Sequence, residues 1–150
     1  ADKRALATAM GADAVIDPTT EDVKARAREL TDGRGVDLVY DVVGGDLSEQ
    51  CLRAMAFDGR FCVVGFTAGI GRVPLNLVLL NNRTTVGVEW GGWVQRHPDA
   101  NRAMMAEVID ALAAGRLRPL EPTRRPLDEA GEVLADLLER RAVGKIVLVP

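Results

Sequence analysis

Three apolar-rich segments of this 150-residue chain end at glycine, and segments with a helical period separate them. They cover residues 36–43 (VDLVYDVV), 60–64 (RFCVV) and 84–90 (TTVGVEW). Their apolar residues are largely consecutive instead of alternating with polar ones, which is typical of strands that are covered on both faces of a parallel sheet. Because helices separate these strands, the pattern predicts an α/β fold with a doubly wound parallel sheet.

The remaining apolar patterns predict further elements around these strands. Helices are expected over residues 3–10, 21–30, 46–57, 74–80, 98–115 and 127–141, and short strands over 14–16 and 145–149. The third helix is expected to begin at Asp46, with Glu49 completing a capping box. Residues 118–126 contain three prolines and lose periodicity, so they predict a connector.

Composition argues against several classes of protein. With 19 Lys and Arg against 22 Asp and Glu, the net charge is −3, and no basic run indicates nucleic-acid binding. No apolar segment reaches the roughly 18 residues of a membrane-spanning helix, and the N-terminal residues do not form a signal peptide, so we expect a cytoplasmic protein. Cys51, Cys62 and the only histidine, His97, do not form a ligand set, so we expect no metal site and a solvent-exposed His97.

The glycines at the strand ends are the first candidates for a functional site. Ligands of open parallel sheets bind beyond the carboxyl ends of the strands. Glycine allows the backbone to approach a ring or a ribose closely, although it also simply makes turns. Three strands that end at glycine favour a cleft lined by backbone. Asp41 could bind a ribose or Mg²⁺ there, or instead cap a turn or form a salt bridge.

Two familiar catalytic and binding patterns are not found. The only dense glycine segment, residues 65–71 (GFTAGIG), does not have the spacing of a G-x-G-x-x-G fingerprint, so we interpret it as a loop and not as a pyrophosphate cradle. The single histidine lies in an expected loop and provides no Ser, His and acid set. We therefore name no catalytic residue.

Several motifs, taken in order, resemble the quinone oxidoreductase branch of the medium-chain dehydrogenase/reductase superfamily. They are ADKR, MGADAVID, GRGVDLVYDVVGG, GRFCVVGF, PLNLVLLNN, VGVEWG and GKIVLVP. The resemblance extends from Lys3 to Pro150 and implies a Rossmann-like sheet that lacks its first two strands, because in the family these precede the position of Ala1. It implies that residues 1–117 form a partial dinucleotide-binding domain and that residues 118–150 return toward a catalytic domain outside this sequence.

The resemblance implies an NADP(H)-dependent oxidoreductase that transfers hydride to a quinone or to an activated enone or carbonyl acceptor. Lys3 matches the family's lysine that pairs with the 2′-phosphate of NADPH, and a cation there favours NADP over NAD. Asp2 leaves an NAD-type arrangement open. The other implied cofactor-binding residues are Val43, Gly44 and Gly45 on the adenosine side, Val64, Gly65, Phe66 and Thr67 beside the nicotinamide ribose, and Val88, Glu89 and Trp90 near the nicotinamide.

The resemblance also implies a partner and leaves alternatives open. The family's last sheet strands pair across a twofold axis, so residues 84–90 are expected to form a homodimer contact. The electron acceptor is expected to be a small molecule. The alternatives are the cofactor domain of a zinc-type alcohol dehydrogenase or of an enoyl reductase, and a noncatalytic dimer or interaction module.

Overall fold

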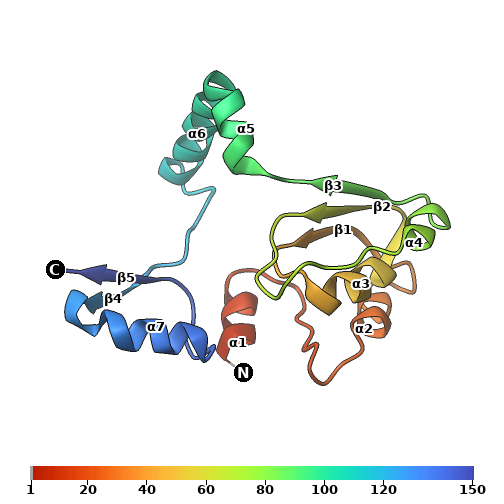
Figure 1. The fold of residues 1–150 in the computed structure, drawn as a ribbon, viewed down its shortest axis with the longest axis horizontal. Helices are drawn as coiled ribbons and strands as arrows, with labels where there is room; N and C mark the ends of the chain where they lie inside the picture. Colours follow the sequence, from red (N-terminus) through yellow and green to blue (C-terminus); the bar gives the residue numbers. More distant parts are fainter. Residues whose placement is uncertain (1) are drawn as a thin grey trace. The chain divides into compact units, whose positions relative to one another are not determined.

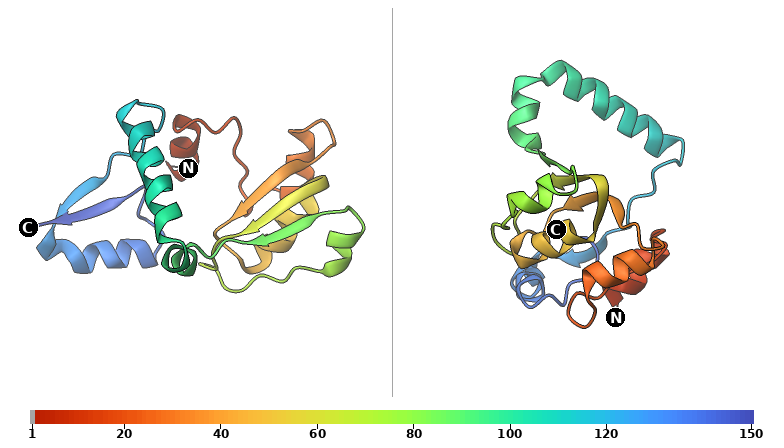
Figure 2. Two further views of the ribbon diagram at one scale, coloured as in Figure 1. Left: turned by 90° about the horizontal axis from the view of Figure 1, so that it is seen from above. Right: turned by 90° about the vertical axis from the view of Figure 1, so that its right-hand side faces the viewer.

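The computed structural model describes residues 2–150, which form two compact units (Figures 1 and 2). One unit is Ile16–Pro98, and the other combines the chain up to Val15 with Asp99–Pro150. We refer to them as the sheet unit and the terminal unit.

The sheet unit is built on three parallel strands in the order β1-β2-β3. They are β1 (Val36–Asp41), β2 (Met55–Val63) and β3 (Thr84–Gly87). Tyr40 lies opposite Cys62, and Cys62 lies opposite Val86, so the three strands are in register at their carboxyl ends. The chain therefore leaves all three strands at the same edge of the sheet (Figure 1).

Helices supply the core on one face of this sheet. They are α2 (Val23–Glu29), α3 (Gly45–Ala54) and the short α4 (Leu75–Leu79), whereas α5 (Trp90–Arg96), which follows β3, has no buried residue. Leu52 of α3 is fully buried against Met55 and Phe61 of β2, which are each 1% exposed. Because α3 carries its apolar residues on the side that meets β1 and β2, this cluster fixes the helix on the sheet.

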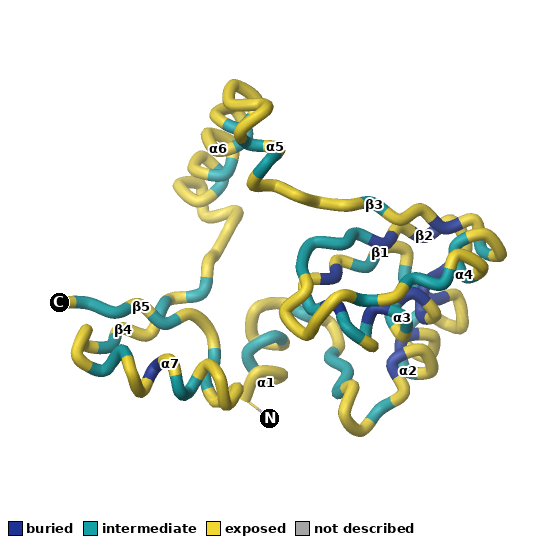
Figure 3. The backbone as a smooth tube through the Cα atoms, viewed as in Figure 1, coloured by how far each residue is buried: buried dark blue, intermediate teal, exposed yellow. Residues whose placement is uncertain are grey.

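The opposite face of the sheet is open within the described residues. Leu38 and Tyr40 of β1 are 58% and 66% exposed, although they belong to an apolar run. In Figure 3 the buried positions gather around β1, β2, α2 and α3. Parallel strands joined through helices confirm the predicted α/β, Rossmann-like fold class.

The terminal unit contains a second, smaller sheet. Its elements are α1 (Asp2–Ala9), α6 (Pro98–Ala113, which begins one residue before the unit), β4 (Thr123–Pro126), a 3-10 turn at Leu127–Glu129, α7 (Ala130–Leu138) and β5 (Ile146–Val149). β4 and β5 pair in parallel, and α7 is the crossover between them. Val133 of α7, 5% exposed, is the one buried apolar residue in the described part of this unit.

Four local predictions were wrong. Residues 14–16 form no strand, because no neighbouring strand pairs with them and the boundary between the units falls at Val15. The expected connector at 118–126 includes β4. This strand forms by pairing with β5, which is distant in the sequence, so the local pattern did not indicate it. The third helix ends at Ala54, and β2 begins at once at Met55. The strand expected over 84–90 ends at Gly87, because α5 begins at Trp90.

The capping box expected at Asp46 does not form. The N-cap of α3 is Gly44, and no side chain caps it. Glu49 is instead hydrogen-bonded to Arg53 one turn further along α3, at 2.6 and 2.9 Å.

Two further expectations concern the chain as a whole. Among the described residues, no helix is long and apolar enough to cross a membrane. The chain passes from one unit to the other after Val15 and again after Pro98, whereas the sequence placed a domain boundary after residue 117. The assignment of residues 118–150 to a catalytic domain stays a prediction.

Candidate functional site

The end of β1 is shaped by one carboxylate. Asp41 Oδ1 accepts hydrogen bonds from the backbone N–H groups of Val43 and Gly44, both at 2.9 Å, and Oδ2 accepts one from Ser48 Oγ at 2.6 Å. Asp41 is only 6% exposed. Burial by itself would raise the pKa of Asp41, but the bonds from Gly44, Ser48 and Val43 outweigh it and hold that pKa below its ordinary value.

Glycine is required at position 44 for two reasons. Its φ is +74°, a backbone conformation that other residues rarely adopt. A Cβ there would also overlap the carbonyl oxygen of Gly69 and come within 3.1 Å of Phe66 Cα. The first strand-end loop therefore runs closely against the second.

The second loop, which follows β2, is bonded to the first. The N–H of Gly45 donates to the carbonyl of Gly69 at 2.8 Å, and the N–H of Ala68 donates to that of Val43 at 2.7 Å. At its start, the N–H groups of Val64 and Gly65 both donate to the carbonyl of Asp41, at 2.8 and 3.2 Å.

The third loop leaves β3 at the same edge. The N–H of Val88 donates to the carbonyl of Val63 at 2.9 Å, which continues the sheet past the end of β3. Both carboxylate oxygens of Glu89 accept from the N–H of Gly92 at 2.8 Å, so Glu89 is the N-cap of α5. Trp90 is 53% exposed.

The structure thus brings most of the predicted cofactor-binding residues to one edge of the sheet. The two loops that hold Val43, Gly44, Gly45, Val64, Gly65, Phe66 and Thr67 are bonded together, and Val88, Glu89 and Trp90 follow the adjacent strand. Lys3 lies in α1 of the terminal unit, with an exposed side chain. The role of each of these residues in binding a cofactor stays a prediction.

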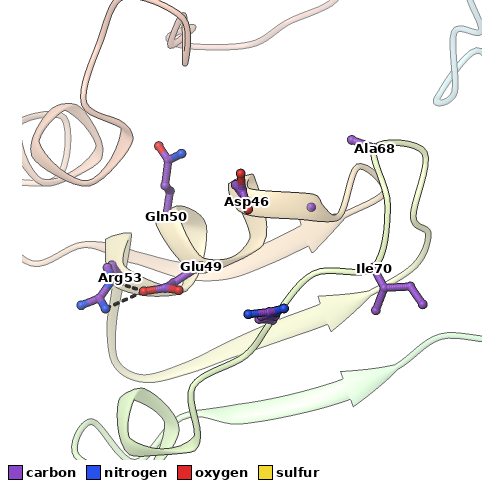
Figure 4. Close-up of a pocket in the computed structure, with 8 residues that line it drawn as sticks. Asp46, Glu49, Gln50, Arg53, Ala68 and Ile70 are labelled. Atoms are coloured by element: carbon purple, nitrogen blue, oxygen red, sulfur yellow. Dashed lines mark hydrogen bonds and ion pairs between the residues drawn. The ribbon is translucent and has the colours of Figure 1, made fainter.

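A cleft of about 730 Å³ opens beside the first two loops. Its lining residues are Gly45, Asp46, Glu49, Gln50, Arg53, Ala68, Ile70 and Arg72. Figure 4 shows that the labelled polar side chains come from α3, with Glu49 turned toward Arg53, and that Ala68 and Ile70 come from the loop after β2. Arg72 adds a cation from the segment after β2. The cleft therefore offers both charged and apolar groups next to the strand ends.

The positions of the remaining chemical groups agree with simple structural roles. His97 is exposed, as expected, and its ring stacks on Trp93 at a centroid distance of 5.0 Å. Burial raises the pKa of the Cys51 thiol, and the Asp41 carboxylate adds to this effect. No group of three or more His, Cys, Asp or Glu residues in the described chain has the geometry to hold a metal ion.

Sequence reasoning missed the partners of Asp41. It left open whether this carboxylate meets a ligand or a neighbouring turn, and the structure shows the turn. A usable signal was present, because Asp side chains often bind the backbone amide two residues further on, and Gly44 and Gly45 mark a turn at this place. Nothing in the local pattern singled out Ser48, which lies seven residues away.

Comparison with known proteins agrees with this architecture. Residues 10–148 match the pattern of a family described as zinc-binding dehydrogenase. The Quinone oxidoreductase-like protein 2 homolog of Nematostella vectensis is 34% identical over 98% of this chain and 41% of its own length. The chain therefore spans about two fifths of the length of that curated relative.

Solved structures give the same result. A quinone oxidoreductase of Pseudomonas syringae aligns with a TM-score of 0.83 and 30% identity, over 98% of this chain and 46% of its own. A mycobacterial protein in complex with NADPH aligns with a TM-score of 0.86 and 28% identity, over 100% of this chain and 47% of its own.

The chain has a parallel sheet whose first two strand-end loops are hydrogen-bonded together, with the third loop beside them. This arrangement defines a Rossmann-like protein. Since the family pattern covers most of the sequence, the chain belongs to the zinc-binding dehydrogenase family. Its resemblance to the quinone oxidoreductase branch of the medium-chain dehydrogenase/reductase superfamily is confirmed. The family's name implies zinc, but the described residues provide no ligand set for that metal.

Proposed function

We propose that this chain is the cofactor-binding portion of an NADP(H)-dependent oxidoreductase that reduces a quinone or an activated enone or carbonyl compound. The observation that carries the proposal is the pair of bonded strand-end loops, 42–45 and 64–71, at the carboxyl edge of a parallel sheet. This edge is where Rossmann-like folds bind dinucleotides. The NADPH complex of the similar mycobacterial structure supports the same cofactor.

The groups at this edge suit a dinucleotide. Val42 and Phe66 are 43% and 53% exposed and offer apolar surface to a planar ring. The exposed Thr67 hydroxyl donates only a long 3.3 Å bond to the carbonyl of Val42, so it is free to bond a ribose instead. Val88 adds apolar surface from the neighbouring strand.

In this proposal the bound NADPH supplies the hydride, and the chain's own residues bind and orient it. The loops after β1 and β2 would hold the nucleotide against the sheet edge and exclude water from one side of it. Lys3 would pair with the 2′-phosphate, because a lysine ammonium is a compact cation suited to a phosphate group.

The test is titration of the purified protein containing this chain with NADPH and with NADH, followed by nicotinamide fluorescence. We expect tighter binding of NADPH, and we expect Lys3→Ala to weaken it by about tenfold while NADH binding stays unchanged, because a single phosphate contact is removed. The matched control is Lys24→Ala, an exposed lysine on α2. Equal binding of both nucleotides, unaffected by Lys3→Ala, would contradict the NADP assignment.

The acceptor is tested separately in the full-length protein. NADPH oxidation is measured with a quinone, an enoyl thioester and an aldehyde, and NADP⁺ reduction is measured with an alcohol. Reduction of the quinone supports the proposal. Preference for the enoyl thioester, or zinc-dependent alcohol oxidation, would favour one of the two alternative dehydrogenase classes instead.

We also propose that β3 forms a homodimer contact. It is an edge strand of the described three-stranded sheet, and unpaired edges are templates for pairing with another chain. Sedimentation of the purified protein is expected to give a dimer. A species that is strictly monomeric at all concentrations measured would refute this contact.

A further inference from the structure

We propose that Asp41 and Ser48 form a clasp that positions the two cofactor-binding loops, so that Asp41 is a positioning residue of the site. This inference rests on the proposed function, because it concerns the same edge of the sheet. It assigns to Asp41 a role different from ligand binding.

The carboxylate of Asp41 is already hydrogen-bonded within the protein. Its two carboxylate oxygens already accept three bonds, at 2.9, 2.9 and 2.6 Å. Ser48 is 3% exposed and Asp41 is 6% exposed, so both residues are almost completely shielded from solvent. Both side chains therefore act on the protein itself.

The clasp holds the first loop on one side, and the second loop binds that same loop on the other side. Val43 donates its N–H to Asp41 and accepts at its carbonyl from Ala68. Gly44 donates to Asp41, and the adjacent Gly45 donates to the carbonyl of Gly69. A change in the turn at Val43 and Gly44 is therefore passed directly to the second loop.

The second loop is held at both of its ends by the same two residues. At its start, Val64 and Gly65 donate to the main-chain carbonyl of Asp41. At its end, Gly71 packs on Ser48 so closely that a Cβ on this glycine would lie 2.7 Å from Ser48 Cβ. Residues 64–71 thus arch from Asp41 to Ser48, with their middle bonded to the first loop.

The charge on Asp41 is needed for this arrangement, because a carboxylate accepts amide and hydroxyl bonds more strongly than a neutral amide does. No arginine or lysine is ion-paired with Asp41 in the part of the chain that the structure describes. The three donors of the turn and of Ser48 therefore replace a counter-ion.

The experiment compares Asp41→Asn and Ser48→Ala with the wild-type protein. Amide hydrogen exchange reports on the loops directly, and NADPH titration reports on the site. Asp37→Asn is the matched control, because Asp37 lies on the same strand but is exposed and paired with Arg34. The amide of Leu30 after α2, bonded to Arg26 at 3.0 Å, reports on the stability of the unit away from the loops.

We expect Asp41→Asn to accelerate exchange at the amides of Gly45 and Ala68 by about tenfold or more, and to weaken NADPH binding by about tenfold, because bonds to a charged acceptor are lost. Exchange at Leu30 and every measurement on Asp37→Asn should stay near the wild-type values. Ser48→Ala should give smaller changes in the same direction, and it serves as the test if Asp41→Asn does not fold.

Two results would overturn the clasp. One is exchange at Gly45 and Ala68 that is unchanged in both variants or that rises equally at Leu30. The other is faster loop exchange with wild-type affinity for NADPH, which would mean that the loops do not need positioning. A wild-type protein that binds no NADPH would instead refute the proposed function, whatever the exchange pattern of the variants.

Discussion

The sheet unit and the terminal unit both consist of parallel strands joined by helices, but they differ in what they bury. In the sheet unit, Leu52, Met55 and Phe61 are almost completely buried, whereas the described terminal unit buries only Val133 among its apolar residues (Figure 3). The 16-residue helix α6 has no buried residue at all. Three strands and two packed helices are enough to enclose a core, whereas two strands and one crossover helix are not.

This difference indicates which region can position a site by its own packing. The strand-end loops stand on a sheet whose core is complete on one face, so their hydrogen bonds have a fixed base. In the terminal unit, apolar side chains such as Ile109 and Leu138 remain exposed at 59% and 85%. Its stability is therefore expected to depend on whatever covers those side chains.

The largest expected effect comes from the same substitution made in both units. Leu52→Ala is expected to lower the free energy of unfolding by about 2–5 kcal/mol, because it empties a fully buried site. Leu134→Ala in α7, where the side chain is 60% exposed, is expected to cost less than about 0.5 kcal/mol. Chemical denaturation measures both values. Equal costs would show that the terminal unit is packed as tightly as the sheet unit.

A smaller loss of stability is expected when a buried arginine of the sheet unit is replaced. Arg83 is 7% exposed, and its guanidinium donates to the carbonyls of Met55, Ala56 and Leu77. Burial, with repulsion from Arg28, lowers the pKa of Arg83. Arg83→Met leaves these buried acceptors with one partner fewer each and is expected to cost about 1–3 kcal/mol.

The matched change in the terminal unit is Arg125→Met. Arg125 is ion-paired with Glu129 and Glu132 near the surface, where such pairs contribute little. Urea denaturation is expected to show a midpoint close to that of the wild type. A loss as large as that of Arg83→Met would contradict the contrast between the units.

A further effect in the sheet unit, smaller than that of Arg83→Met, is expected from acidification. The pKa of Asp41 is lower in the folded protein than in the unfolded chain, where it is about 3.9. Its contribution to stability is therefore complete above that value and is lost as the pH falls through the lower folded-state pKa.

Thermal unfolding measured from about pH 6 downward tests this, because that starting pH lies above the range in which carboxyl groups titrate. The wild type is expected to lose more stability than Asp41→Asn between roughly pH 5 and the acid limit of folding. Parallel curves for the two proteins would mean that the Asp41 carboxylate contributes no pH-dependent stability.

Much of the sheet unit could be predicted from the sequence, because its signals are local. The predicted runs 36–43 and 84–90 contain β1 and β3, the run 60–64 overlaps the carboxyl end of β2, and the amphipathic period of α2 is equally plain. That the strand-end loops share one edge follows from parallel topology alone.

The features that escaped prediction depend on distant partners or on a single hydrogen bond. β4 exists because Arg124 and its neighbours pair with β5 more than 20 residues later. The early end of β3 follows from Glu89, whose carboxylate begins α5 by capping Gly92. The site's organisation depends on Asp41 meeting Ser48, and the sequence offered Asp41 several other roles.

Gly69 and Gly71 illustrate a consequence of the loop geometry for second-site suppression. Gly69 has a φ of +102° but open space around it, so Gly69→Ala strains only its own backbone. Gly71 has no such backbone conformation, and Gly71→Ala would collide with Ser48. Removing that side chain with Ser48→Gly should relieve the collision, although it also removes the bond to Asp41, whereas no change elsewhere relieves the strain at Gly69. The steric clash at Gly71 can therefore be relieved by a compensating substitution, whereas the backbone strain at Gly69 cannot.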